Sequence, residues 1–353
     1  MLDRGTVAAL RGCPAAGILA GRGVTLESEG LLVPRGPDRD ARDSGQFGVA
    51  LRWLGEEAEY AAYFLNYHSR TPSVSYRNAD AADIRTALTG AGAPALTAPT
   101  LLGRGSYFLE YPEDIRLYGL SFSTTLPTGT AWQGEISYRP NAPVQINTTD
   151  MTFKLASPAL AAQAAGGGAA GLAAALALAN ADNRGYNRKE VTQLQTTLTH
   201  FFDQVLGADR LTLVGEVGYT RIGGLESKGD LRYGRDSIYG SPFGTQASNQ
   251  LAAQMYGFHG FLTSSSWGYR ARGILDYSNV FAGINLKPNL AWSHDVDGYG
   301  PVFNEGAKAV SLGLDAEYQN TYTASLSYTN FLGGDFNTAT DRDFIALSFG
   351  VNF

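Results

Sequence analysis

Charged side chains recur at alternate positions in the C-terminal third of the sequence, where they could pair with one another or guide a charged solute. Arg270 and Arg272 are two residues apart, as are Asp315 and Glu317. Residues two apart in a strand point to the same face of a sheet. We therefore expect six side chains to line a water-filled interior: Arg270, Arg272, Asp276, Lys287, Asp315 and Glu317. Opposite charges on neighbouring strands could brace that interior or line a path for polar solutes, and both interpretations remain open.

The remaining acids and histidines offer weak candidates for metal binding or catalysis. The stretch HDVDG places Asp295 and Asp297 beside a glycine, a fragment of a calcium-loop pattern that lacks the third acid. The four histidines lack metal-ligand spacing: His68, His200, His259 and His294. A lipid hydrolase would need a serine beside a histidine, and the sequence assigns none. We predict no enzymatic activity, no cofactor and no metal site, with Asp295 and Asp297 as a weak loop candidate.

The elements that must position these charges are long strands with one apolar face. Val310, Leu312 and Leu314 alternate with small or polar residues, and the next segment, TYTASLSYTNFL, repeats the pattern. This two-residue period predicts strands, two of them at 267–279 and 280–292. We count about eleven strands, many of roughly ten to thirteen residues. That is about twice the usual strand length and close to what a tilted strand needs to cross a bilayer.

The polar strand faces decide whether the apolar faces lie in a core or against lipid. Charges at alternate positions of consecutive long strands are tolerated in a membrane only where they face a wet lumen. The predicted fold is therefore all-β, an antiparallel transmembrane β-barrel, and a large soluble barrel or sandwich is the alternative. Aromatic residues near the strand ends would form girdles at the two membrane interfaces: Trp267, Tyr277, Trp292, Tyr318 and Tyr322.

The final stretch, DFIALSFGVNF, ends the chain on an alternating strand. Ile345 and Leu347 are large and apolar, and the residues between them are small or polar. We expect this strand to complete the lipid-facing wall and to present its edge and aromatics to the barrel-assembly machinery of the outer membrane. The residues predicted to carry this signal are Phe349, Val351 and Phe353.

Composition excludes several other classes of protein. The 353 residues include 19 Tyr, 17 Phe and 43 Gly, which suits a barrel whose every second residue faces water. A net charge of −6 gives no basic surface, so nucleic acid is not an expected partner. A single cysteine excludes an internal disulfide framework. No stretch has the dense apolar content of a membrane-spanning helix.

We expect an irregular N-terminal segment at 1–43 and a single barrel domain at 44–353. Long loops are predicted at 78–104, 141–188 and 223–250, with a short Ala/Gly-rich helical insertion near 157–180. The first residues show no export signal, and an odd strand count does not close a bacterial barrel neatly. We therefore expect the chain to be the C-terminal part of a longer protein whose signal peptide lies upstream.

Several blocks also carry a family resemblance. They are SGQFGVALRWL, ADRLTLVGEVGYTRIGGL, LRYGRDSIYG and the stretch from Trp292 to Phe353. In this order they resemble a proteobacterial outer-membrane β-barrel family catalogued as a domain of unknown function, the DUF1302 family, from about Ser44 onward. The resemblance implies a large barrel with a signal peptide and an N-terminal region, discussed beside uptake channels for fatty acids and hydrocarbons.

Together these features predict a barrel in the outer membrane of a Gram-negative bacterium. The expected function is a channel or transporter for hydrophobic or lipid-like compounds. A hydrophilic porin is the first alternative, a structural protein without transport the second, and an outer-membrane lipid hydrolase the least favoured. Expected partners are outer-membrane lipids, the barrel-assembly machinery and hydrophobic small molecules.

Overall fold

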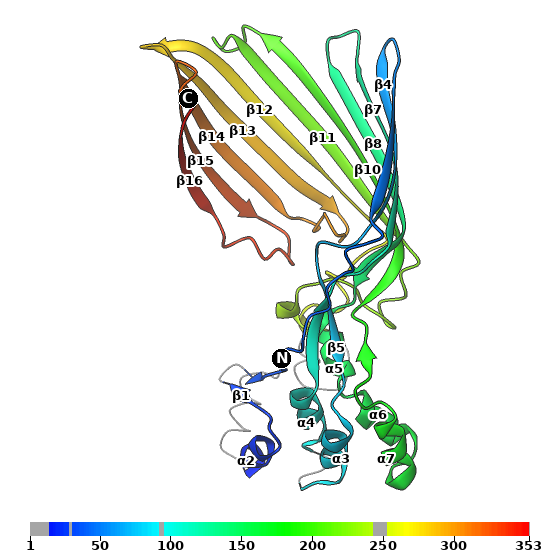
Figure 1. Cartoon of the computed structure of the whole chain (residues 1–353). Coiled ribbons are helices and arrows are strands. Elements are labelled where there is room, and N and C mark those ends of the chain that lie inside the picture. Colours follow the sequence, from blue (N-terminus) through cyan, green and yellow to red (C-terminus); the bar gives the residue numbers. More distant parts are fainter. Residues whose placement is uncertain (1–13, 28–29, 92–94, 243–252, 353) are drawn as a thin grey trace.

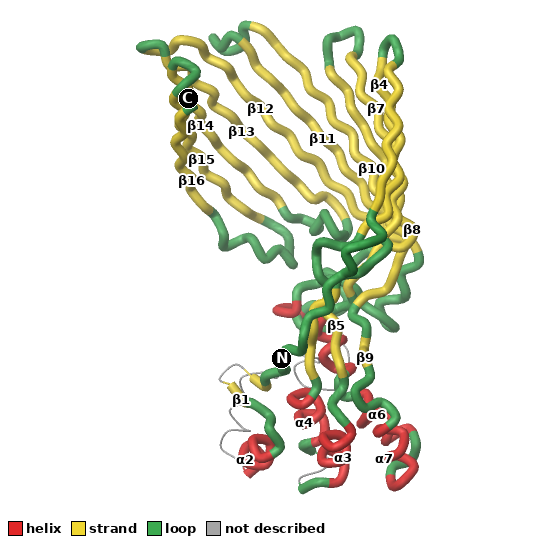
Figure 2. The backbone as a smooth tube through the Cα atoms, viewed as in Figure 1, coloured by secondary structure: helices red, strands yellow, loops and turns green. Residues whose placement is uncertain are grey.

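The computed structural model describes residues 14–27, 30–91, 95–242 and 253–352 (Figure 1). Most of the described chain is β-structure in antiparallel sheets. Figure 2 shows a large curved sheet with a smaller body of helices and short strands, here called the cap, at one end. None of the described helices is both long and apolar enough to cross a membrane.

The large sheet contains eleven antiparallel strands that follow one another in chain order, interrupted only by the strands of the cap. They are β3 (Phe47–Leu54), β4 (Ala58–Tyr67), β7 (Ile115–Thr125), β8 (Ala131–Gln145), β10 (Tyr186–Asp203), β11 (Arg210–Gly223), β12 (Ser265–Phe281), β13 (Ile284–Asp297), β14 (Lys308–Tyr318), β15 (Tyr322–Leu332) and β16 (Phe344–Val351). The predicted antiparallel β-architecture and strand number are confirmed. Among the described strands, β3 and β16 pair on one side only, so this sheet is open (Figure 1).

The strand register gives the large sheet one apolar face and one polar face. Leu290, Leu312 and Tyr328 are neighbours across β13, β14 and β15, and they are 50, 58 and 42 % exposed. The same row continues to Ile345 on β16. The positions between them carry small, polar and charged side chains. Because side chains alternate along a strand, every apolar row falls on the same face.

The hairpin between β12 and β13 lies further along the chain than predicted. The separation of strands between 279 and 280 was wrong, because β12 continues to Phe281 and β13 begins at Ile284. Ala282 and Gly283 form the turn, with φ angles of 52° and 84°. Alanine rarely adopts a positive φ and so gives no turn signal. Asn279, a typical turn residue, instead lies in a bulge with a φ of 48°.

The cap is built from the N-terminal residues and from long connections at the end of the sheet opposite the short turns (Figure 1). The described parts of the predicted long loops 78–104, 141–188 and 223–250 contribute to it and contain regular elements. The cap elements are α2 (Pro14–Gly21), β1 (Leu26–Glu27), β2 (Gly30–Leu31), β5 (Ser73–Arg77), α3 (Ala81–Thr89), α4 (Thr97–Arg104), β6 (Ser106–Glu110), α5 (Thr148–Lys154), α6 (Ser157–Ala164), α7 (Gly168–Leu176), β9 (Asp182–Asn183) and the 3-10 turn η1 (Ser237–Tyr239).

Local signals explain why these connections fold. The side chain of Asp80 accepts a hydrogen bond from the backbone N–H of Asp83 at 2.8 Å and so caps α3. Asn147 caps α5 in the same way. The two helices α6 and α7 form the Ala/Gly-rich insertion at its predicted position, with the intervening turn supplied by glycines of positive φ at 166–168.

The main hydrophobic core lies where the cap meets the sheet. Met151 of α5 and Leu155, which follows this helix, are fully buried and pack with Ile146, Ile222 and Tyr233. Ile222 belongs to β11, so this core attaches the cap to the large sheet. A second core lies between α3, α4, α6 and α7. The cap is therefore packed against the end of the sheet and is not joined to it by loops alone.

Candidate functional site

The six charged residues predicted to line an interior all lie on the polar face of β12, β13 and β14. Lys287 Nζ is 3.6 Å from Asp276 Oδ1. Arg272 donates to Asn289 Oδ1 at 3.3 Å, and the Asn289 amide donates to Asp315 at 3.2 Å. These contacts cross from one strand to the next. They brace the polar face while leaving its surface hydrophilic.

Arg270 pairs with Asp295, which the sequence offered as a weak metal-loop candidate. An Arg270 nitrogen is 3.0 Å from Asp295 Oδ1, and the backbone N–H of Asn304 donates to Oδ2 at 2.8 Å. Both carboxylate oxygens of Asp295 therefore already have donors. Asp297 ends β13 opposite Trp267. Among the described residues, no group of three or more His, Cys, Asp or Glu side chains could hold a metal ion.

The five aromatic residues predicted as interface girdles lie towards the two ends of the strands. Tyr318 and Tyr322 stack beside the turn between β14 and β15, with ring centroids 6.3 Å apart. Tyr277 donates to a backbone carbonyl of the neighbouring turn at 3.1 Å. Trp267 and Trp292 lie nearer the cap, and the Trp292 indole donates to a tyrosine hydroxyl at 3.2 Å. The arrangement gives two separated aromatic rows.

The strand predicted to carry an assembly signal is an edge strand. Among the described strands, β16 pairs only with β15. Phe349 and Val351 project from its apolar face and are 77 and 56 % exposed. Phe353, the third residue of the predicted signal, lies outside the described residues.

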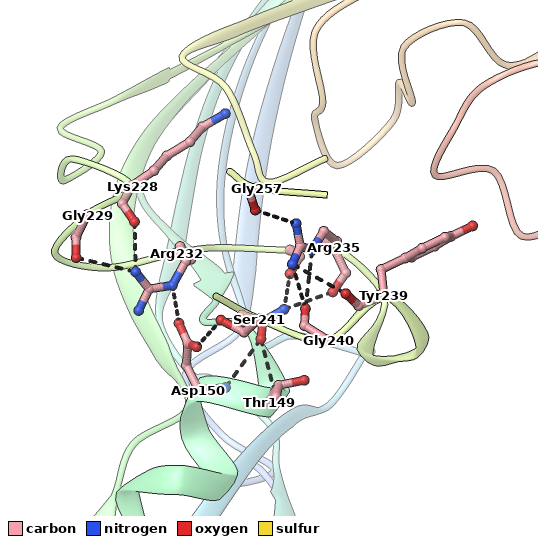
Figure 3. Close-up of polar contacts among 12 residues, drawn as sticks. Thr149, Asp150, Lys228, Gly229, Arg232, Arg235, Tyr239, Gly240, Ser241 and Gly257 are labelled. Atoms are coloured by element: carbon pink, nitrogen blue, oxygen red, sulfur yellow. Dashed lines mark hydrogen bonds and ion pairs between the residues drawn. The ribbon is translucent and has the colours of Figure 1, made fainter. Parts of the chain in front are cut away.

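A buried ion pair lies where the cap meets the sheet (Figure 3). Arg232 Nε donates to Asp150 Oδ2 at 2.6 Å, and the two side chains are only 3 and 5 % exposed. The other carboxylate oxygen accepts a hydrogen bond from the Ser241 hydroxyl. Arg232 also donates to the backbone carbonyls of Lys228 and Gly229. One carboxylate thus joins α5 to two loop segments of the cap.

A second arginine ties loop segments of the cap together through backbone carbonyls (Figure 3). Arg235 donates to the carbonyls of Gly240 and Gly257 at 2.8 and 3.1 Å. Its guanidinium lies 3.9 Å from the ring centroid of Phe261. Burial lowers the pKa of Arg235 to about 10, so the side chain stays charged at neutral pH. The segments 235–240 and 257–261 are therefore held by one cation.

Two adjoining clefts lie between the cap and the polar face. The arginine cleft, named for Arg70 and Arg139 in its lining, has a volume of about 600 Å³. The aromatic cleft has a volume of about 640 Å³ and is lined by three aromatic residues: Tyr299, Phe303 and Phe336. The two linings share Pro143, Val144 and Pro301, so the clefts form one continuous hollow. Within the described chain, Arg139 Nε and Asn304 Oδ1 are buried without a hydrogen-bond partner.

Sequence reasoning missed the buried ion pair and both clefts. Asp150 and Arg232 are 82 residues apart, and no local pattern connects them. Arg139 could have been found, because it alternates with Glu135 and Ser137 and therefore belongs to the polar face. The position of Arg139 relative to the cap could not have been predicted, because the cap sequence has no periodic pattern that fixes where the cap lies.

Comparison with known proteins adds the family. A search of curated proteins found no match. A family model described as "Protein of unknown function (DUF1302)" matches residues 5–353, which is nearly the whole chain. The predicted family is thereby confirmed, and the chain belongs to the DUF1302 family.

Proposed function

We propose that this chain contributes eleven strands to the wall of a β-barrel in the Gram-negative outer membrane, through which hydrophobic or lipid-like compounds pass. The continuous apolar face of the large sheet carries the proposal. Its register rows run from β3 to β16 and leave large apolar side chains exposed. In water, exposed apolar surface costs about 25 cal/mol per Å², and patches of this extent normally mark interaction surfaces. Contact with lipid tails removes that cost.

The polar face supports the same proposal. The charged side chains in the middle of β12, β13 and β14 lie on this face, and charges pair across the strands, as in the contacts of Lys287 with Asp276 and of Arg270 with Asp295. Charges at membrane depth are tolerated only against water or protein. A polar face turned to a lumen satisfies this requirement, because the lumen of such barrels holds water.

The two ends of the sheet give the proposed barrel an orientation. Short turns join the strands at one end, for example Ala282–Gly283, and the long connections that build the cap lie at the other. Outer-membrane barrels have short periplasmic turns and longer extracellular loops. We therefore infer that the cap faces the cell exterior. We also expect β16, with Phe349 and Val351, to be the strand that the barrel-assembly machinery recognises.

The clefts between cap and polar face favour hydrophobic cargo. Their shared residues Pro143, Val144 and Pro301 are apolar, and the aromatic cleft continues this surface with Phe303 and Phe336. Concave sites that combine an apolar lining with a few polar groups typically hold small organic molecules. A compound arriving from outside would meet these clefts before it reached the polar face.

A hydrophilic porin is the second candidate, favoured by the charges on the polar face. Single-channel conductance separates the two functions. A barrel that passes hydrophobic compounds through a plugged lumen should be nearly silent to ions, and we expect little conductance from the purified protein in planar bilayers. A steady large conductance would favour the porin and overturn hydrophobic passage.

Outer-membrane insertion is tested first by heat-modifiable gel mobility. The chain is expressed behind an outer-membrane export signal, and the outer-membrane fraction is run with and without boiling. We expect the chain in that fraction, with faster migration before boiling, because a sheet that closes into a barrel with further strands stays folded in detergent. Recovery outside the membranes with no boiling-dependent shift would contradict the barrel.

A further inference from the structure

The arginine cleft has an unusual balance of charge. Arg70 and Arg139 line it, and none of its lining residues is an aspartate or glutamate. Neither arginine forms an ion pair with a described carboxylate. Arg139 donates from Nη2 to the side-chain oxygen of Gln193, but its Nε is buried without a partner. A guanidinium has five donors in a planar fork that matches a carboxylate, so this end of the hollow is suited to an anion.

The surface beside these arginines is apolar. Ile115, Val144 and Val191 line the same cleft and are 3, 5 and 2 % exposed. Beyond the shared residues, the aromatic cleft adds Leu262 and Phe303. The lining of the aromatic cleft also includes Asp236 and Arg235, whose guanidinium donates to backbone carbonyls. The hollow therefore places two arginines without a neighbouring acid at one end and a surface with several apolar side chains beyond them. A fully hydrophilic anion would leave that surface uncovered, and a neutral hydrocarbon would leave the two guanidinium groups without a counter-charge.

We propose that this hollow binds an amphipathic carboxylate, a molecule with one carboxylate and a long apolar body. The carboxylate lies against Arg139 and Arg70, and the apolar body runs over Pro143 and Val144 towards the aromatic cleft. The inference rests on the proposed function, because it names the class of hydrophobic compound that the cap would receive. The proposal specifies a negatively charged group on the ligand and places that group at the end of the hollow lined by Arg70 and Arg139.

Direct binding of dodecanoate tests the site. The full chain is placed in nanodiscs, and binding of radiolabelled dodecanoate is measured by scintillation proximity against empty nanodiscs. Unlabelled dodecanoate, 1-dodecanol and dodecyltrimethylammonium, which share the chain but differ in charge, then compete. We expect dodecanoate to compete best and the cation worst. A charge-assisted bidentate contact predicts a difference of about tenfold or more between dodecanoate and the alcohol.

Substitutions locate the carboxylate. Arg139→Gln keeps a polar side chain but removes the charge, and we expect dodecanoate to bind about tenfold more weakly while competition by dodecanol is unchanged. Arg139→Lys should recover part of the affinity, because it restores the charge without the fork. The matched control is Arg272→Gln, since Arg272 lies on the same polar face outside both clefts and should leave binding unchanged. The exposed Arg70 offers an independent variant, Arg70→Gln, should Arg139→Gln fail to fold.

Equal competition by dodecanol and dodecanoate, or wild-type binding by both folded glutamine variants, would overturn the proposal. Passage is measured separately by loading liposomes that contain the chain. Binding that depends on Arg139 without any passage would refute the transport function and leave the site intact. Passage of dodecanoate that is indifferent to Arg139 and Arg70 would refute the site alone.

Discussion

At the scale of single residues, the buried pair of Asp150 and Arg232 joins α5 to a loop segment of the cap. Removing one partner of a buried ion pair leaves an uncompensated charge, which typically costs about 3–5 kcal/mol. Asp150→Asn should therefore lower the urea midpoint for proteolytic cleavage of the cap by a corresponding amount. The matched control is Ser241→Ala, which removes only a neutral donor to the same carboxylate and should cost about 1 kcal/mol.

A double substitution distinguishes a charge effect from loss of packing. In Asp150→Leu with Arg232→Met, no charge remains buried at this position, and we expect much of the lost stability to return. A cap that is as resistant in Asp150→Asn as in the wild type would show that the pair does not hold it. This pair could not be predicted from the sequence. An aspartate in the first turn of a helix indicates only a favourable interaction with the helix N-terminus and does not identify a distant arginine partner.

At the scale of elements, the strands could be predicted from the sequence, whereas the turns between them could be predicted only in part. Alternation at positions such as Leu312, Leu314 and Leu326 reports directly which face is apolar, and the register confirms it. Turn positions depend on backbone angles that the side chain need not reveal. Ala282 adopts a φ of 52°, and Asn279, which has the more typical turn chemistry, forms a bulge instead.

The strained turn gives a prediction for the β12–β13 hairpin. Placing a residue other than glycine or asparagine in the left-handed backbone region costs about 1–2 kcal/mol. Asparagine tolerates this backbone conformation better than alanine does. Ala282→Asn should therefore stabilise the refolded protein by up to about 1 kcal/mol, read as a higher unfolding midpoint in urea. Gly283→Ala is the matched control and should destabilise the hairpin, since Gly283 has a φ of 84°. An unchanged midpoint for Ala282→Asn would indicate that the turn is not strained.

At the scale of the whole molecule, the sheet could be predicted and the cap could not. The alternation of residue types along a strand shows which of its faces is apolar, whereas the cap is held together by contacts between segments that are distant in the sequence. Arg77 donates to Asp182 at 2.8 Å across 105 residues, and Asn183 donates to Asn78 over the same separation. Such pairs leave no periodic trace in the sequence. The arginine cleft could not be predicted for the same reason, because Arg70 and Arg139 line one cleft only in the folded structure.

The proposed orientation of the molecule can be tested by cysteine labelling. In a background where the single cysteine, Cys13, is replaced by serine, Ala170→Cys places a thiol on exposed α7 of the cap, and Thr128→Cys places one in the exposed β7–β8 turn. A membrane-impermeant maleimide applied to intact cells should label position 170, whereas position 128 should react only after the outer membrane is permeabilised, because short turns face the periplasm. The reverse pattern would place the cap in the periplasm and move the arginine cleft to the exit side of the pathway. Labelling of both positions in intact cells would refute a membrane-spanning sheet, since its two ends would then share one compartment.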